Sequence, residues 1–140
     1  MSGQQLSESI EDYLEALWIS EEEGASLAKI SWIARHLDVS SPSVVEMLKK
    51  LEKQGLVVYE PRDGVRLTET GKKKAEQIIR SHRLAELLLT DILKMKLDMK
   101  TACGLEHHLS EDVADAVCTY LNHPRLCPHG NKIPKGNCCP

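Results

Sequence analysis

The sequence predicts a mainly α-helical fold in which one short β-hairpin interrupts a series of helices. Apolar residues recur at helical spacing along most of the 140-residue chain. Aromatic residues make up only 4% and Phe is absent, so the core is aliphatic, which suits packed helices better than an aromatic-rich barrel or sandwich. A turn that contains Pro and Gly separates two short β-rich runs, which indicates the hairpin.

Three helices are expected before the hairpin. They cover residues 7–19, 29–37 and 41–55, and a tight turn at 38–40 joins the second to the third. Ser7 and Ser41 suit helix N-caps, Pro42 suits a first helical position, and Gly24 and Gly55 suit helix ends. Two short helices joined by so short a turn form the helix-turn-helix pattern.

The hairpin strands are expected at 56–60 and 65–68, around a turn at 61–64. A hairpin that directly follows a helix-turn-helix is typical of a winged helix. Each element alone is a weak signal, but their order and their short connections are together specific. The sequence therefore predicts an N-terminal winged helix-turn-helix.

The second half of the chain is also expected to be helical. A long helix is predicted from Glu69 to about Leu93, followed by shorter helices at 98–108 and 110–122. From His123 onward Pro, Gly and Cys dominate, which predicts an irregular tail. The expected domains are a winged helix at 1–75, a helical domain at 76–123 that shares the long helix from 69, and a Cys-rich tail at 124–140.

Charge is distributed unevenly, although the formal net charge is only −3. Residues 1–27 carry seven acidic and no Lys or Arg side chains, whereas residues 28–75 carry ten basic against six acidic side chains. The basic segment coincides with the expected winged helix and favours a polyanionic partner, with ordinary solvated faces as the alternative.

Membrane and secreted proteins are not expected. No apolar run approaches the roughly 20 residues that span a bilayer, and no charged-then-apolar leader opens the chain. The five cysteines are odd in number, which suits reduced thiols better than a disulfide framework. We therefore expect a cytoplasmic protein with no membrane partner.

The residues expected to contact DNA follow from the helix-turn-helix, whose second helix enters the major groove. Small hydroxyl and aliphatic side chains in its first turns suit base edges, while basic side chains further along the helix and at the wing suit phosphates. The expected contact residues are Ser40, Ser41, Ser43, Val44, Lys49, Lys50, Lys53, Arg62 and Arg66.

Three expected helices each present potential metal ligands on one helical face. The ligands are Asp12 and Glu15, three residues apart; His82 and Glu86, four apart; and Cys103, Glu106 and His107 at i, i+3 and i+4. This donor mixture suits Fe(II), Mn(II), Co(II), Ni(II) or Zn(II). One pair alone is more often structural, but a buried Glu beside a Cys needs a cation as partner.

Five stretches of the chain stand out together, in this order: SIEDYLEALW, VSSPSVVEMLKKLEKQGLVVYE, VRLTETGKKKA, HRLAELLL and CGLEHHLSED. They resemble the diphtheria toxin repressor family of metal-dependent transcriptional repressors, and the resemblance covers about residues 6–134. It implies a winged helix-turn-helix followed by a helical metal-binding and dimerisation domain. It also implies a homodimer that binds operator DNA when loaded with Fe(II) or Mn(II) and turns off metal-uptake genes.

The resemblance places the family's metal ligands on the residues singled out above. Asp12 matches the manganese-responsive branch, whereas Cys103 matches the iron-responsive branch, and Glu86 matches an ancillary-site ligand of the latter. Because thiolate is softer than carboxylate, Fe(II) is favoured, Mn(II) comes next, and Co(II), Ni(II) or Zn(II) also fit. Met99 replaces an ancillary-site His of the iron branch, which argues against the two-site arrangement of that branch. The length of the chain resembles that of the compact two-domain form, which is therefore expected.

The tail offers further soft ligands. They are Cys127, His129, Cys138 and Cys139, with Cys118 in the preceding helix. A second site for Zn(II) or an iron–sulfur cluster is one interpretation, and a flexible tail with reactive thiols is the other.

Two other functions stay open from the residues alone. One is a winged-helix regulator that senses redox state or another ligand through its cysteines. The other is a metal-dependent hydrolase, because clusters of carboxylates and imidazoles activate water. The sequence has no Gly-rich phosphate loop and no HExxH motif, so no enzymatic activity is expected.

Overall fold

The computed structural model of the chain describes residues 8–140, so the expected cap Ser7 lies outside the described residues. The fold is mainly α-helical with one two-stranded antiparallel sheet, which confirms the predicted class. The chain divides into two compact units after Ala75, within the long helix α4 (Glu69–Leu87). Each unit is described by itself.

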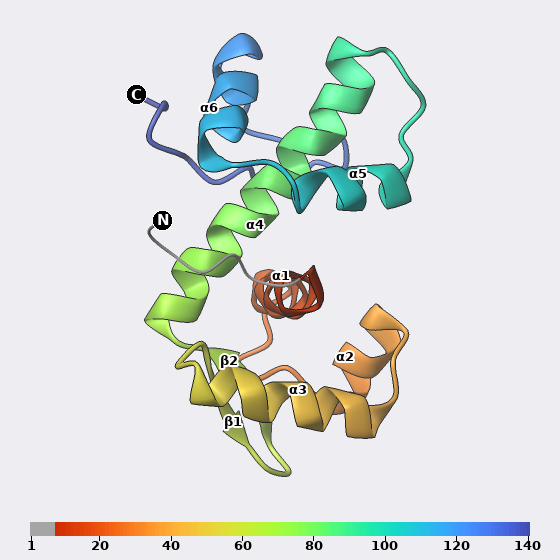
Figure 1. Cartoon of the computed structure of the whole chain (residues 1–140), viewed down its shortest axis with the longest axis vertical. Coiled ribbons are helices and arrows are strands. Elements are labelled where there is room, and N and C mark those ends of the chain that lie inside the picture. The colour runs from red at the N-terminus through yellow and green to blue at the C-terminus, as the bar shows by residue number, and fades with distance from the viewer. Residues whose placement is uncertain (1–7) are drawn as a thin grey trace. The chain divides into compact units, whose positions relative to one another are not determined.

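The first unit contains three helices and the hairpin (Figure 1). Its elements before α4 are α1 (Glu8–Glu22), α2 (Ile30–Leu37), α3 (Ser41–Lys53), β1 (Val57–Glu60) and β2 (Gly64–Leu67). Helix α1 packs against α2 and β2, α2 packs against α3, and α3 packs against β1. This order of elements is the predicted helix-turn-helix followed by a wing.

The turn between α2 and α3 differs from the prediction by one residue. Asp38 adopts a left-handed conformation with φ of 56°, which ends α2. Ser40 is then extended, and its hydroxyl accepts a hydrogen bond from the Ser43 backbone N–H at 3.2 Å. The N-cap is therefore Ser40 and not Ser41, because a cap residue takes extended backbone angles one position before the first helical residue.

The wing is held against the segment that precedes α2. Val57 pairs with Leu67 and Glu60 pairs with Gly64 across the hairpin. The Ala28 N–H donates to Val65 O at 2.8 Å, and the Val65 N–H donates back to Ala28 O at 3.0 Å. A Cβ on Gly64 would lie 2.5 Å from the Ala28 oxygen, so this close approach of backbones needs glycine.

The second unit contains the rest of α4, a π-helical turn η1 (Leu88–Ile92), α5 (Met99–Glu106), α6 (Glu111–Tyr120) and the tail. The predicted long helix thus changes its hydrogen-bond pattern after Leu87. At this point Thr90 Oγ1 donates to the Glu86 backbone oxygen at 3.1 Å, a contact that competes with the α-helical ladder. Apolar periodicity alone does not separate one continuous α-helix from a helix with such an insertion.

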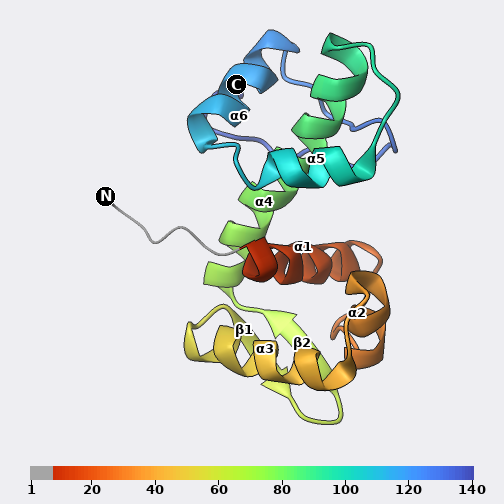
Figure 2. The ribbon, with the colours of Figure 1, turned by 45° about the vertical axis from the view of Figure 1, so that its right-hand side comes forward.

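The tail has no helix in the structure (Figure 2), yet it belongs to the core of the second unit. The buried core there consists of Leu84, Leu87, Ala114, Cys118, Cys127 and Ile133. Arg83 of α4 donates through Nη1 to the backbone oxygen of Lys132 at 2.5 Å, which ties the tail to α4. The tail is therefore packed, although it is irregular.

None of the helices in residues 8–140 combines the length and the apolar character that a membrane crossing requires.

Candidate functional site

Helix α5 presents Cys103, Glu106 and His107 to one another. Their donor atoms lie within 4.8 Å of each other. The Cys103 Sγ is 3.8 Å from His107 Nε2, and that nitrogen is 4.0 Å from Glu106 Oε1. The local i, i+3, i+4 spacing produces this grouping, because such positions share a face of a helix. We call these three residues with His82 the α5 cluster.

The start of α5 is fixed by Asp98. Its carboxylate accepts from the Lys100 N–H at 3.1 Å and from the Thr101 hydroxyl at 2.6 Å. These bonds, that of Thr101 first, hold the pKa of the Asp98 carboxyl below its usual value. The cap begins the helix five residues before Cys103 and so sets which face carries the ligands.

Glu106 is the central residue of the α5 cluster. It is 3% exposed, and its Oε1 lies 3.2 Å from His82 Nδ1. Its Oε2 has no hydrogen-bond partner among the described residues. A buried carboxylate with an unsatisfied oxygen costs about 3 kcal/mol or more unless a cation or a donor compensates it. A divalent metal fits this donor set and supplies the missing charge.

His82 lies between two buried carboxylates. Its Nε2 is 3.3 Å from Glu86 Oε1, while its Nδ1 is 3.2 Å from Glu106 Oε1. A neutral imidazole donates from only one nitrogen, so it cannot donate to both carboxylates. The predicted pairing of His82 with Glu86 on one face of α4 is present, and Glu106 joins it.

Glu86 also meets the tail. Its Oε2 lies 2.7 Å from His129 Nδ1, and Cys127 is within 4.8 Å of both. Cys127 and His129 were expected to share a site with Cys138 and Cys139, and the structure instead groups them with Glu86. The reason is a tight turn in which the Gly130 N–H donates to the Cys127 oxygen at 2.9 Å.

The remaining tail cysteines form a separate group. Cys118, Cys138 and Cys139 lie with His123, whose donor atoms are all within 4.8 Å of one another. His123 was missed in the sequence, where its only signal is a position five residues after Cys118 at the end of a helix. Burial raises the pKa of the Cys118 thiol to about 12, so this thiol keeps its proton at neutral pH when no cation is bound.

Asp12 and Glu15 are half-buried on α1 in the first unit. Their separation of three residues places them on one face of the helix. Their role as metal ligands stays a prediction.

The surface expected to contact DNA is exposed except at one position. The exposed members are Ser40, Ser41, Ser43, Lys49, Lys50, Lys53, Arg62 and Arg66. Val44 is 0% exposed and packs in the core on the same stripe as Leu48 and Leu51, so the expectation that it meets a base is wrong. The first turn of α3 has one face toward solvent and one toward the core. Val44 lies on the core face, because it begins the i, i+4, i+7 apolar stripe that Leu48 and Leu51 continue.

The Ser40 hydroxyl is also engaged within the protein. It accepts from the Ser43 N–H and donates to the Ser43 hydroxyl at 2.8 Å. Capping therefore accounts for Ser40, while the Ser41 side chain stands exposed at the start of α3.

An apolar groove runs along the outer face of α6 in the second unit. It is lined by Ile92, Asp112, Val113, Ala116, Val117 and Tyr120. Val113 is 45% exposed and Tyr120 is 76% exposed, whereas Ala114 and Cys118 on the opposite face are buried. An apolar stripe that faces solvent on one side of a helix is typical of an interaction surface.

Both halves of the chain match domains of known proteins. Residues 5–65 match the N-terminal DNA-binding domain of iron-dependent repressors, and residues 68–135 match their metal-binding and dimerisation domain. The iron-dependent repressor IdeR of Mycobacterium tuberculosis is 36% identical over 132 residues, which are 93% of this chain and 57% of that protein. The diphtheria toxin repressor of Corynebacterium diphtheriae is 35% identical over 131 residues, 92% of this chain and 58% of that protein.

Solved structures agree with these matches. A manganese-dependent transcriptional repressor in complex with manganese superposes with a TM-score of 0.84 at 31% identity, over 91% of this chain and 59% of that one. The chain thus spans less than two thirds of the length of these three relatives. The order of the two matched domains is that of the two units in the structure, and the resemblance in the sequence motifs is confirmed. The chain belongs to the iron-dependent repressor family.

Proposed function

We propose that this protein is a metal-dependent transcriptional repressor that binds operator DNA as a homodimer and controls the uptake of metal ions. The observation that carries the proposal is the buried Glu106, grouped with Cys103, His107 and His82, in a chain whose first unit is a winged helix. The buried carboxylate makes the second unit responsive to a cation, and the winged helix supplies the DNA-binding surface. No catalytic role is part of the proposal, since the family consists of transcriptional repressors.

The proposed metal is Fe(II), with Mn(II) as the second choice. Family membership favours iron or manganese, and the α5 cluster, which combines one sulfur, one carboxylate and two imidazoles, ranks Fe(II) above Mn(II) in affinity. Asp12 and Glu15 of α1 are proposed as further ligands. Family membership and their i, i+3 spacing support that assignment.

Metal loading is proposed to act through α1. When bound, the cation supplies positive charge among acidic and thiol side chains. Asp12 and Glu15 are the acidic side chains through which α1 responds to that charge, and α1 packs against α2 and β2 of the winged helix. A fixed α1 then holds the two recognition helices of the dimer at the spacing of successive major grooves, about 34 Å.

The α6 groove is the proposed dimer surface. Its exposed apolar side chains would bury against the same surface of a second copy, as in a two-fold interface. Analytical ultracentrifugation of a Val113→Glu, Tyr120→Glu variant is expected to give a monomer with native helical content. A dimer that persists in this variant would place the interface elsewhere.

The decisive experiment measures DNA affinity with and without metal under anaerobic conditions. DNA is first selected from a random library by the Fe(II)-loaded protein, and its affinity is then compared across Mn(II), Fe(II), Co(II), Ni(II), Zn(II) and no metal. We expect tight binding only with metal, and a lower half-saturating concentration for Fe(II) than for Mn(II). Equal affinities with and without metal would contradict the proposal, and apo binding that an oxidant abolishes would favour a redox sensor instead.

A further inference from the structure

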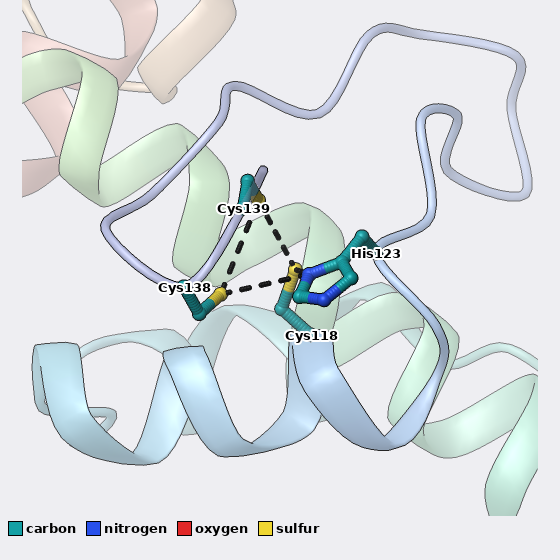
Figure 3. Close-up of side chains that lie close together, drawn as sticks. All are labelled: Cys118, His123, Cys138 and Cys139. Atoms are coloured by element: carbon teal, nitrogen blue, oxygen red, sulfur yellow. Dashed lines mark hydrogen bonds between the residues drawn. The ribbon is translucent and has the colours of Figure 1, made fainter.

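Four side chains outside the α5 cluster converge at the end of the second unit (Figure 3). Cys118 comes from the C-terminal turn of α6, His123 from the loop that follows, and Cys138 and Cys139 from the end of the tail. Figure 3 shows the three sulfurs and the imidazole pointing toward one another. We call these four residues the tail cluster.

The distances in the tail cluster match the edges of a metal-centred tetrahedron. The Cys118 Sγ lies 3.7 Å from the Cys139 Sγ, which is 3.9 Å from the Cys138 Sγ. His123 Nδ1 lies 3.6 Å from Cys118 Sγ and 3.8 Å from Cys138 Sγ. Zinc bonds of about 2.3 Å to sulfur and about 2.1 Å to nitrogen place tetrahedral ligands about 3.8 Å (S to S) and about 3.6 Å (S to N) apart.

The backbone is bent so that His123 faces the cysteines. Asn122 and His123 both adopt left-handed conformations, with φ of 62° and 55°. The His123 N–H donates to the Cys118 oxygen at 2.8 Å, which closes the turn. Consecutive non-glycine residues seldom take this conformation, and such strain persists where the surrounding structure holds it in place.

A buried arginine compensates the charge that three thiolates would bring. Arg80 is 5% exposed, and its Nη2 lies 3.3 Å from Cys138 Sγ while its Nη1 lies 2.9 Å from Asp115 Oδ1. Three thiolates, one neutral imidazole and one divalent ion carry one net negative charge, and the guanidinium that lies against Cys138 attracts it while also pairing with Asp115. A donor that bonds to a metal ligand in this way orients that ligand and tunes the metal.

Gly136 makes room for that arginine. A Cβ at this position would lie 2.3 Å from Arg80 Cζ, so no larger residue fits while Arg80 keeps its place. The Cys139 N–H donates to the Gly136 oxygen at 3.1 Å, which turns the chain so that both terminal cysteines face α6. The ligands Cys138 and Cys139, the turn that presents them and the position of Arg80 therefore depend on one another.

We propose that Cys118, His123, Cys138 and Cys139 form a tetrahedral zinc site, distinct from the α5 cluster and independent of the proposed regulatory function. Three sulfurs and one imidazole are a common donor set of structural zinc. The ligands of an iron–sulfur cluster surround several irons and stand further apart than ligands of one ion. A disulfide between Cys118 and Cys139 would leave both His123 and Cys138 without a role. Zinc accounts for all four side chains.

The test uses the full chain with Co(II) as a spectroscopic probe and Zn(II) as its competitor, under anaerobic reducing conditions. The background variant carries Cys103→Ser and Cys127→Ser, so that its remaining thiols are those of the tail cluster. We expect the sulfur-to-cobalt charge-transfer bands of a tetrahedral three-thiolate site, and Zn(II) is expected to remove them. Absence of these bands would overturn the proposal.

Adding Cys138→Ser and Cys139→Ser to the background is expected to abolish the bands and to weaken Zn(II) binding by more than about 100-fold, since even second-shell losses cost about 10- to 100-fold. Bands that survive these changes would overturn the proposal.

X-ray absorption of the Zn(II)-loaded background protein does not depend on how the serine variants fold. A shell of three sulfurs and one nitrogen supports the site, and a shell of only oxygen and nitrogen refutes it. A background protein that carries a Cys118–Cys139 disulfide and takes up no zinc after reduction would refute it as well. None of these measurements uses DNA, so they are separate from the test of the repressor.

Discussion

The α5 cluster and the tail cluster lie in one unit of the protein, yet they use different chemistry. The α5 cluster contains a single sulfur and depends on a buried carboxylate, whereas the tail cluster contains three sulfurs and no carboxylate. A buried carboxylate with an unsatisfied oxygen is costly without a cation, whereas burial raises the pKa of the Cys118 thiol, which therefore keeps its proton. This difference suits the first cluster to a metal-responsive switch and the second to a lasting structural ion.

The two clusters also differ in how the chain builds them. Cys103 and Glu106 lie in α5, His107 is the C-cap of this helix, and α4 adds His82. The tail cluster joins residues that are up to 21 positions apart. The α5 cluster is therefore formed mainly by local spacing on one helix. The tail cluster is formed only when the tail folds back against α6.

The largest expected effect is that of Glu106→Gln. The amide removes the negative charge that calls for a cation, so we expect metal-dependent DNA affinity to fall by more than about 100-fold, beyond the range of second-shell losses. Fluorescence anisotropy on the selected DNA measures it. Glu76→Gln, an exposed position on α4, is the matched control and should behave as wild type. Retained metal dependence in Glu106→Gln would remove the carboxylate from the switch.

The second effect concerns the tail cluster alone. In Gly136→Ala the added methyl meets Arg80, so we expect zinc affinity at the tail cluster to fall by about 10- to 100-fold without change at the α5 cluster. Competition with a chromophoric chelator measures both. Gly104→Ala is the control, because a Cβ there meets nothing within 4 Å among the described residues. Equal losses at both clusters would mean that they are not independent.

A smaller effect is expected from Cys103→Glu. Replacing the sulfur by a harder oxygen donor should shift the metal preference of DNA binding from Fe(II) toward Mn(II) by about tenfold. The ratio of the two half-saturating metal concentrations gives this shift directly. His108→Ala, at the exposed next position beyond the cluster, is the control. An unchanged ranking of metals would show that Cys103 does not set the preference.

The smallest effect is on the stability of the helix that carries the α5 cluster. The Asp98 pKa is lowered in the folded protein, so its carboxylate stabilises the fold above the unfolded pKa of about 3.9, and that contribution disappears as the pH falls through the folded value. The Asp98→Asn variant keeps the cap but does not titrate. Urea midpoints of the two proteins should converge as the pH falls below about 4, and a constant difference would exclude the carboxylate.

The parts of the fold that follow local rules were predictable. Helical periodicity, Pro42 and Ser110 located α3 and α6, and Ser110 does accept from the Val113 N–H at 3.3 Å. The α5 triplet followed from spacing on a single helix. Family resemblance then supplied what composition alone does not, namely that the domains bind DNA and metal.

What escaped prediction depends on the backbone at a few special positions. His123 joins the tail cluster only because Asn122 and His123 both take positive φ. Neither residue is glycine, which is the usual sequence signal for that backbone conformation. Cys127 and His129 part from Cys138 because a tight turn intervenes. Val44 was assigned to DNA because its position in the first turn of α3 suits both core and groove, and only packing decides between them.

The π-helical turn η1 separates two surfaces at the end of α4, one that carries the candidate ligands His82 and Glu86 and one that lines the α6 groove through Ile92. One residue inserted into an α-helix rotates everything after it by about 100° relative to everything before it. His82 and Glu86 precede the insertion and Ile92 lies at its end, so the helix carries ligands in one phase and a groove-lining side chain in another. An α-helical hydrogen-bond pattern through 88–92 would point Ile92 in a different direction relative to His82 and Glu86, because α- and π-helical turns contain different numbers of residues.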